Sequence, residues 1–488
     1  MIGLFTAAEV RAAEAPLLAA GPEGALMQRA ATGLATVCVR LLGAVYGRRV
    51  ALLVGSGNNG GDALFAGAFL AGRGARVTAV LLDADRAHPA GLAALRRAGG
   101  RTRTAPGAGD VVGRADLVLD GMVGIGGRGG LRGDAAALAR AAAEGAGITV
   151  AVDVPSGVDA STGAVEGAAF PAMHTVTFGA VKRGLVVGEG RGFTGELHLV
   201  GIGLEPHLPP AAVAQLTDAD AAAALEPPSA GDDKYSQGVV GVVAGSAAYP
   251  GAGVLCTGAA LRTRPGLVRY AGTAADGVRA AWPEAIVTEG RPADAGRVQA
   301  WVVGPGMGTD DDARSVLAEV LVTDLPVLVD ADALTMAARE PDLVRRRSAP
   351  TVLTPHDREF ERFGVEVGAD RIAAARRLAA DLGAVVLLKG DATVVADPDG
   401  TAYVNGTGTA ALATAGTGDV LSGITGSLLA TGLPPARAAA VAAHLHGRAG
   451  QLAARRGPLL AGDLVRVLPE AVGRVRGPGG GGLGDSGA

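Results

Sequence analysis

The feature that most constrains the fold of this chain is a regular alternation between short apolar runs and longer alanine-rich stretches. Four runs in the first half are rich in Val, Leu and Ala and bounded by Gly or Asp, as buried parallel strands usually are. They span residues 49–55, 75–83, 115–122 and 148–154. Helical stretches such as "DALFAGAFLAGRG" lie between them. This alternation predicts a doubly wound parallel sheet, to which 174–179 and 196–203 add two expected strands.

The alternation returns in the second half, after a stretch of different composition. Residues 204–237 are rich in Pro and Ala and have no strand character, so we expect a domain boundary near Pro210 and a second domain from about Leu216. The expected strands of that domain are 238–246, 298–304, 325–332, 349–356 and 384–390. Several helices are expected from Asp419 onward.

The chain is therefore predicted to consist of two α/β domains in tandem, residues 1–212 and 216–475. Its 488 residues are enough for two full cores. The glycine-rich end, residues 476–488, is expected to be disordered.

Composition excludes several kinds of partner. A formal net charge of -4 leaves no basic surface for nucleic acid. No apolar run approaches the roughly 18 residues of a membrane span, and the first residues carry too many charges for a signal peptide. The only cysteines, Cys38 and Cys256, lie in different halves, which argues against a disulfide framework. We expect a soluble cytoplasmic protein.

A glycine cluster in the first half predicts a dinucleotide site. "GSGNNG", residues 55–60, fits G-x-G-x-x-G after a strand and before a helix, and Asp83 ends the next strand. An NAD-dependent dehydrogenase is therefore one interpretation. Asp62 counts against it, because a carboxylate there would lie close to a pyrophosphate. Asn58 and Asn59 also supply side-chain amides at positions where a hydride-transfer enzyme needs only space for the dinucleotide.

Other polar residues follow strand ends, where open α/β sheets bind ligands. Asp120 and Asp153 each end an expected strand, and Ser156 follows Asp153 closely. A single aspartate of this kind is most simply a loop cap. Together with Asn59 they predict a site at one edge of the sheet.

The second half lacks a Walker A sequence but contains "TAGTGD", residues 414–419, in front of a helix. Backbone N–H groups of such a turn can bind an anion, helped by the helix N-terminus. Asp419 could then take the proton from an alcohol that attacks a phosphate, while the amides of 416–418 stabilise the transition-state charge. An aspartate that merely caps the helix is the alternative, and the residues alone leave both open.

Histidine spacing does not indicate a metal site. His444 and His446 are two apart on an expected helix and face different directions, which favours packing or capping. His88, His174, His198 and His207 show no ligand spacing.

Three segments of the first half, "NNGGD", "VLDGMVGIGGRGG" and "VAVDVPSGVDASTG", together resemble the NAD(P)H-hydrate epimerase (YjeF N-terminal) family. "FTAAEVRAAE", "LMQRAA" and "VTFGAVKRGL" extend the resemblance over roughly residues 1–210. It implies a Rossmann-like fold, a potassium ion on Asn59, Asp120 and Ser156, and Asp153 as the group that moves a proton at C6 of the hydrated nicotinamide. The implied substrate-binding residues are Asn58, Asn59, Gly60, Gly61, Asp62, Gly124, Ile125, Gly126, Gly127, Arg128, Gly129, Gly130 and Asp153. Lys182 is read equally as an assisting group or a surface lysine, and is left out of the catalytic set.

The second half contains, in order, "DKYSQGVVGVVAGS", "GPGMG", "LVDADAL", "LTPHDREF", "LLKGDATVV" and "TAGTGDVLSGITGSLLA". Over roughly residues 216–475 this order resembles the ribokinase-like, ADP-dependent NAD(P)H-hydrate dehydratase family. The resemblance implies that the hydrated dinucleotide contacts Ala252, Gly308, His356 and Asp419, the last being catalytic. The implied ADP-binding residues are Lys389, Gly390, Asp391, Ala392, Thr393, Thr409, Ala410, Ala415, Gly416, Thr417 and Gly418. Mg²⁺ is expected on the donor phosphates, although no dedicated carboxylate cage is evident.

The two resemblances together imply a bifunctional repair enzyme. Its first domain would interconvert the R and S hydrates of NADH and NADPH, and its second would use ADP to dehydrate the S form, releasing AMP and phosphate. Its partners would be these small molecules, and we expect a homo-oligomer. Two departures from the family pattern affect one end of the second pocket: Asp233 replaces a usual His, and "LRTRPGLV" with Arg264 and Pro265 replaces a small-residue turn.

Two other functions remain open on the sequence. One is a ribokinase-type small-alcohol kinase fused to a dinucleotide-binding regulatory module. The other is a dinucleotide sensor without catalysis.

Overall fold

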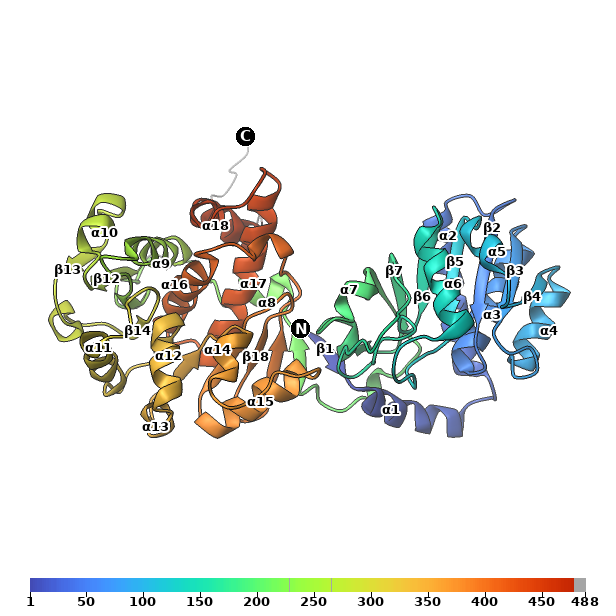
Figure 1. Cartoon of the computed structure of the whole chain (residues 1–488), viewed down its shortest axis with the longest axis horizontal. Helices are drawn as coiled ribbons and strands as arrows, with labels where there is room; N and C mark the ends of the chain where they lie inside the picture. Colours follow the sequence, from blue (N-terminus) through green and yellow to red (C-terminus); the bar gives the residue numbers. More distant parts are fainter. Residues whose placement is uncertain (228, 265, 478–488) are drawn as a thin grey trace. The chain divides into compact units, whose positions relative to one another are not determined.

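The computed structural model describes residues 1–227, 229–264 and 266–477, and the chain forms two compact units (Figure 1). The first unit is Gly3–Ala211, and the second combines Met1–Ile2 with the chain from Ala212 onward. Pro265 and the expected disordered tail from residue 478 lie outside the described residues. Arg476 still belongs to a helix, so the tail cannot begin before Gly477.

The first unit is built on a parallel sheet with the strand order β4-β3-β2-β5-β6-β7-β9. The bounds are β2 Arg49–Val54, β3 Arg76–Leu81, β4 Arg101–Thr104, β5 Leu117–Gly121, β6 Ile148–Val152, β7 His174–Phe178 and β9 Glu196–Val200. A short pair, β1 Ile2–Phe5 and β8 Val181–Lys182, is also parallel. The doubly wound parallel sheet predicted for the first half is thus confirmed.

Helices cover both faces of this sheet because side chains alternate along each strand. Leu52 of β2 packs in one buried cluster with Leu64, while its neighbour Leu53 packs in another with Leu138. The helices are α1 Ala7–Ala20, α2 Ala25–Leu42, α3 Asn58–Gly72, α4 Pro89–Arg97, α5 Gly109–Gly113, α6 Gly133–Glu144 and α7 Arg191–Thr194, with 3₁₀ turns η1 Arg183–Leu185 and η2 Glu205–His207.

In the second unit the strand order is β13-β12-β11-β14-β15-β16-β17-β18-β19-β10. Pairing is parallel from β13 to β17, antiparallel on both sides of β18, and parallel again between β19 and β10. The bounds are β10 Val213–Gln215, β11 Val239–Val243, β12 Leu267–Ala271, β13 Ile286–Thr288, β14 Ala300–Val303, β15 Val327–Val329, β16 Thr351–Leu353, β17 Val385–Leu388, β18 Val394–Ala396 and β19 Ala402–Val404. β10 lies in the segment expected to lack strands, so that expectation was wrong.

The core of the second unit gathers around α16 Thr417–Leu429, whose residues Val420, Ile424 and Leu428 are fully buried. The other helices are α8 Asp218–Ala222, α9 Pro250–Thr263, α10 Ala275–Ala281, α11 Asp311–Leu321, α12 Ala331–Arg339, α13 Asp342–Arg345, α14 Asp357–Glu361, α15 Arg371–Leu382, α17 Pro435–Ala454 and α18 Ala461–Arg476, with 3₁₀ turns η3 Pro292–Ala295 and η4 Ala410–Leu412. Within the described parts of the chain, no helix has the length and apolar character needed to cross a membrane.

Two candidate active sites

The first candidate site lies at the carboxyl ends of β2, β5 and β6. Gly55 follows β2, and a Cβ on it would lie 1.8 Å from the carbonyl oxygen of Met122. Only glycine therefore lets the loops after β2 and β5 approach so closely. An added Cβ at Gly124 would similarly lie 3.0 Å from the Asn59 side chain. The glycine loop 124–130 is thus held against the start of α3, as the predicted site requires.

Asp120 and Ser156 form a buried pair within this site. The hydroxyl of Ser156 donates to Asp120 Oδ1 at 2.6 Å, and its backbone N–H donates to Oδ2 at 2.8 Å. Burial raises the pKa of Asp120 to about 6, although the hydrogen bonds from Ser156 and Met122 act in the opposite direction. Because this carboxylate is shielded from water, a cation beside it would stabilise its charged form.

Asn59 and Asp62 are buried on α3 with polar atoms that lack partners. Among the described residues, neither Nδ2 of Asn59 nor Oδ1 of Asp62 has a hydrogen-bond partner. Burial, followed by the charges of Asp153 and Glu14, raises the pKa of Asp62 well above its usual range. Unpaired buried polar groups are costly, so both side chains are poised to bind a ligand.

Asp153 follows β6 in a strained conformation, with φ of 65°, and is paired with Lys182. Its Oδ1 accepts hydrogen bonds from Lys182 Nζ at 2.5 Å, Phe178 N at 3.1 Å and Thr177 Oγ1 at 3.2 Å. Lys182 is 1% exposed and also donates to Thr177 and the carbonyl of Phe178. These three bonds all use Oδ1. Oδ2 accepts no hydrogen bond from the described residues.

Glu14 of α1 completes an acidic group around Asp153. Burial and the charge of Asp153 raise the pKa of Glu14, while Lys182 and Arg11 lower it. From the sequence, Glu14 was assigned no role, and Lys182 was left open between an assisting group and a surface lysine. The available signals were that Glu14 ends "FTAAEVRAAE" and Lys182 lies in "VTFGAVKRGL". Of the predicted binding residues, Asn58, Gly126 and Arg128 are exposed.

The second candidate site lies at the carboxyl ends of β15, β16 and β17. Asp330 follows β15 and is 1% exposed. Its Oδ1 accepts from Lys389 Nζ at 2.8 Å and its Oδ2 from the Ser422 hydroxyl at 2.7 Å. Burial would lower the pKa of Lys389, but Asp330 and Glu359 outweigh it and the pKa is raised. Lys389 therefore stays charged.

Asp419 is not the N-cap of α16. That position belongs to Gly416, whose φ of 85° is left-handed, and Asp419 lies in the first helical turn. Burial, then the charge of Asp330, raises the pKa of Asp419 to about 6, against an opposing effect of Lys389. Its carboxylate accepts no hydrogen bond from the described residues. The capping alternative is therefore excluded.

The turn before α16 is held rigidly beside a positive charge. The Thr417 hydroxyl bonds the carbonyls of Leu412, at 2.8 Å, and Thr414, at 2.9 Å. An added Cβ at Gly418 would lie 3.7 Å from Lys389 Nζ. The helix N-terminus and the ammonium group thus point to the same place, where an anion would be stabilised.

The predicted dinucleotide contacts of the second site surround this turn. The N–H of Gly308 donates to Asp332 Oδ2 at 2.9 Å. Ala252 Cβ lies 2.9 Å from an added Cβ at Gly306, so the start of α9 touches the 304–308 loop. His356 caps α14 through Nδ1, and its half-exposed side chain lies 3.6 Å from Glu359, which is itself 3.5 Å from Lys389.

Asp330 and Asp332 lie in the "LVDADAL" motif, but neither of them was assigned a role from the sequence. His446, which is buried near Thr417, was assigned only a packing or capping role. Burial lowers the pKa of His446 to about 4, and within the described residues its Nε2 has no hydrogen-bond partner.

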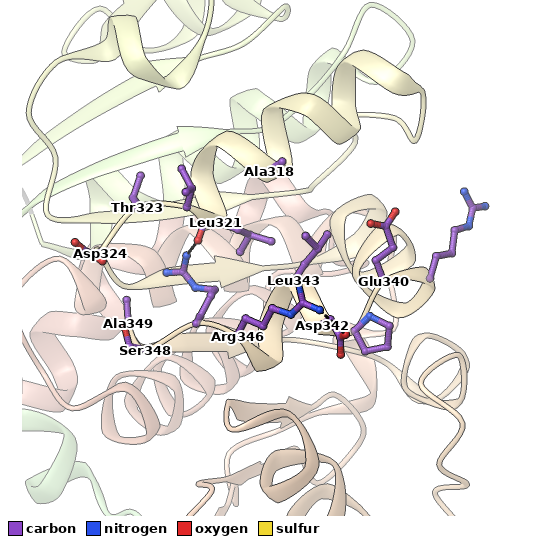
Figure 2. A pocket seen from close by; sticks show the side chains of 14 residues that line it. Ala318, Leu321, Thr323, Asp324, Glu340, Asp342, Leu343, Arg346, Ser348 and Ala349 are labelled. Atoms are coloured by element: carbon purple, nitrogen blue, oxygen red, sulfur yellow. Dashed lines mark hydrogen bonds and ion pairs between the residues drawn. The ribbon is translucent and has the colours of Figure 1, made fainter.

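A pocket of about 780 Å³ in the second unit is unrelated to this chemistry (Figure 2). Its lining includes Thr323 and Asp324, which precede β15, and Ser348 and Ala349, which precede β16. It therefore lies at the amino ends of the strands, opposite Asp330 and His356.

Comparison with known proteins matches each half of the chain to a known family. The family model for the YjeF-related protein N-terminus matches residues 23–184, and that for NAD(P)H-hydrate dehydratase matches residues 240–470. The bifunctional NAD(P)H-hydrate repair enzyme Nnr of Mycobacterium leprae is 52% identical over 479 residues, covering 97% of this chain and 98% of its own. Its counterpart in Mycobacterium tuberculosis is 54% identical over 437 residues, covering 88% and 90%.

Among solved structures, a ribokinase-like superfamily protein from Enterococcus faecalis matches with a TM-score of 0.51 at 24% identity, covering 56% of this chain and 99% of its own. This likeness shows the fold of the second unit and confirms the ribokinase-like architecture expected from the sequence. With the full-length matches to curated relatives, it leads to one conclusion: the chain belongs to the family of bifunctional NAD(P)H-hydrate repair enzymes.

Proposed function

We propose that this chain repairs hydrated NADH and NADPH in two steps, epimerisation in the first unit and ADP-dependent dehydration in the second. The observation that carries the proposal is an aspartate at each sheet edge, buried at Asp153 and half-buried at Asp419, with at least one carboxylate oxygen that accepts no hydrogen bond from the described residues. Asp153 has one oxygen held by Lys182 and the other unengaged by the described residues. Asp419 lies in the first turn of α16, the helix whose N-terminus faces Lys389.

In the first unit, Asp153 gives a proton to the C6 hydroxyl, which leaves as water, and takes a proton back when water adds again to either face of the ring. Lys182 holds Oδ1, which directs Oδ2 toward the substrate. Asp62, whose pKa is raised by burial, offers a carboxyl group, and Asn59 offers an amide donor beside it. The two unpaired groups would bind polar parts of the dinucleotide.

Potassium fits the buried Asp120 group of this unit. Asp120, Ser156 and Asn59 offer hard oxygen atoms and no soft ligand. Burial raises the pKa of Asp120 to about 6 despite its hydrogen bonds from Ser156 and Met122, so a monovalent cation beside it would stabilise the charged form. The ion would fix the loops after β5 and β6 that carry the substrate contacts.

In the second unit, Asp419 takes the proton of the C6 hydroxyl as this oxygen attacks the β-phosphoryl group of ADP. The amides at the start of α16 and the Lys389 ammonium stabilise the transferring phosphoryl group. AMP leaves, and the ester then loses phosphate from C6 and a proton from C5, which forms the ring double bond of NADH or NADPH. Because both oxygens of Asp330 are already bonded, Mg²⁺ would depend on the donor phosphates for most of its ligands.

Two substitutions in the full chain test the proposal on a mixture of both hydrate epimers with ADP. Asp419→Asn should keep ADP binding but lose NADH formation by about two to four decades, the scale of a positioned base. Asp153→Asn should convert the S epimer normally and leave the R epimer to its slow spontaneous exchange. Normal turnover by Asp419→Asn, or clearance of both epimers at the wild-type rate by Asp153→Asn, would contradict the assignment.

Product analysis separates this function from the two alternatives. Repair requires AMP, phosphate and NADH in equal amounts. A stable phosphorylated alcohol would indicate a small-alcohol kinase, and tight binding without turnover would indicate a sensor.

Potassium dependence forms a separate prediction. Replacing K⁺ by tetramethylammonium at constant ionic strength should slow epimerisation, because the organic cation is too large for the buried Asp120 group. The ADP-dependent step on pure S epimer is the internal control. An epimerisation rate that does not change with the cation would contradict the assignment of potassium to this site.

A further inference from the structure

His174, Glu196 and His198 form a cluster on two neighbouring strands of the first unit. His174 begins β7 and Glu196 begins β9, and their Cα atoms are paired in the parallel register. His198 is two residues beyond Glu196, so both side chains lie on the same face of β9. Histidine spacing along the chain does not reveal this cluster, because its two strands are brought together only by the fold.

The three side chains form a triangle of the size that a metal ion requires. His174 Nδ1 lies 3.1 Å from His198 Nε2 and 3.5 Å from Glu196 Oε2, and His198 Nε2 lies 3.9 Å from Glu196 Oε1. One ligand atom from each residue falls within 4.8 Å of the others. Zinc bound tetrahedrally at about 2.0–2.1 Å places its ligand atoms roughly 3.3 Å apart. Only small side-chain adjustments separate the cluster from that geometry.

We propose that His174, His198 and Glu196 bind one divalent transition-metal ion of the zinc class. Two imidazole nitrogens and one carboxylate oxygen suit Zn²⁺, Co²⁺ or Ni²⁺, whereas Mg²⁺ and K⁺ prefer oxygen ligands alone. The fourth position remains open to water. In the absence of an ion, the two histidines share a hydrogen bond between the same nitrogens, and the metal replaces its proton.

The surroundings permit an ion to enter and stay. The two histidine side chains are 15% and 24% exposed, which orients them, while Glu196 is 68% exposed at the rim. The positive charge of Arg40, in the last turn of α2, acts on His198 and is one charge that a bound cation would have to overcome.

The cluster lies away from the proposed epimerase chemistry. It is at the amino ends of β7 and β9, whereas Phe178, which donates to Asp153, is at the carboxyl end of β7. Four residues of strand separate the two ends by about 13 Å. The ion would therefore tie the edge strand β9 to β7 and stabilise the unit without entering the reaction.

The test is zinc binding to the full chain after dialysis against a chelator, followed by calorimetry. We expect one Zn²⁺ per chain and a higher unfolding temperature of the first unit with Zn²⁺ but not with Mg²⁺. His174→Ala and His198→Ala should each weaken binding by at least the roughly 10- to 100-fold that outer-shell groups are worth. Glu196→Gln, an exposed change with little effect on folding, should also weaken it. His207→Ala removes an exposed histidine of the same unit and should bind as the wild type does.

Cobalt gives an independent readout, because Co²⁺ in a four-coordinate nitrogen and oxygen site has strong visible absorption that octahedral Co²⁺ lacks. The wild type and His207→Ala should show these bands, and Glu196→Gln and His198→Ala should not. Failure of the wild type to take up zinc, or unchanged affinity in Glu196→Gln and His198→Ala, would overturn the proposal. Circular dichroism without metal confirms that each variant is folded before it is compared.

Discussion

At the scale of single residues, the decisive groups are charges that the fold buries. A lysine after a strand is usually solvated, so Lys182 could not be distinguished from a surface residue in the sequence. It is buried because β7 and β8 turn its side chain onto Asp153, a contact that no local pattern encodes. Asp419 and Asp153 could be predicted, because strand ends and glycine turns mark their positions. Their partners, and the raised pKa of Asp419, depend on which distant residues pack against them.

Replacing Lys182 by methionine tests this pairing. Lys182→Met leaves the Asp153 carboxylate buried without its cation, which should cost about 3–5 kcal/mol in the free energy of unfolding of the first unit. Epimerisation should fall sharply, while ADP-dependent dehydration of pure S epimer continues. Urea unfolding and the two rate assays measure these effects.

The double variant Asp153→Asn with Lys182→Met provides the control. It removes both charges and should regain most of the lost stability without regaining activity. Equal stability of Lys182→Met and the wild type would mean that the pair contributes nothing to folding.

The raised pKa of Asp419 predicts the pH profile of the dehydratase. As a base it must be ionised, so the rate should rise with pH through about 6 and level off above it. At pH 5 only about a tenth of the molecules would be active, whereas an aspartate near the ordinary value of about 4 would stay active there. Single-turnover NADH formation from the S epimer at saturating ADP measures the profile. A flat profile between pH 5 and 8 would show that Asp419 is not the base.

At the scale of elements, most apolar strands were predictable, whereas the short polar ones and the apolar strands β12 and β18 were missed. The runs at 49–55 and 238–246 contain β2 and β11, because continuous Val and Leu identify buried parallel strands. β4, with the sequence RTRT, is largely exposed, and β10 has only three residues in a Pro-rich segment. Both depend on a neighbouring strand for their conformation. The pairing register of neighbouring strands could not be predicted from the sequence either, which is why the His174 cluster was missed.

Gly416 begins helix α16 and belongs to the turn of the second site. Its left-handed φ of 85° begins α16, and an added Cβ would lie 2.8 Å from Leu255 Cδ1 and 3.1 Å from Ala461 Cβ. Gly416→Ala should therefore reduce the unfolding free energy of the second unit by about 1–3 kcal/mol and weaken ADP binding. Gly462→Ala is the matched control, because nothing lies within 4 Å of its added Cβ. Urea unfolding of both variants gives the comparison, and equal values would contradict the strain at Gly416.

At the scale of the whole molecule, the chain is two units, each with its own sheet, core and candidate site. The tandem order was visible in the sequence because the same alternation occurs twice. The exact division was less visible, since Met1–Ile2 group with the second unit while Gly3 onward forms the first. Residues that are distant along the chain thus join one compact unit, which composition cannot reveal.

Independent sites predict that defective chains can complement each other. A mixture of Asp153→Asn and Asp419→Asn chains should clear both epimers, because each supplies the activity that the other lacks and the S hydrate diffuses between them. Complete conversion at a rate proportional to both concentrations is expected. Residual R epimer at long times would mean that the two steps must occur within one chain. Inactive double-variant chains are the control.

The unpaired groups of Asn59 and Asp62 also have a consequence for protein turnover in the cell. Each unsatisfied buried group costs about 1–3 kcal/mol, and a bound dinucleotide would remove part of that cost. The enzyme would then resist proteases best when damaged coenzyme is abundant and least when it is scarce. Its steady-state level would follow the amount of damage to be repaired, with no transcriptional control required.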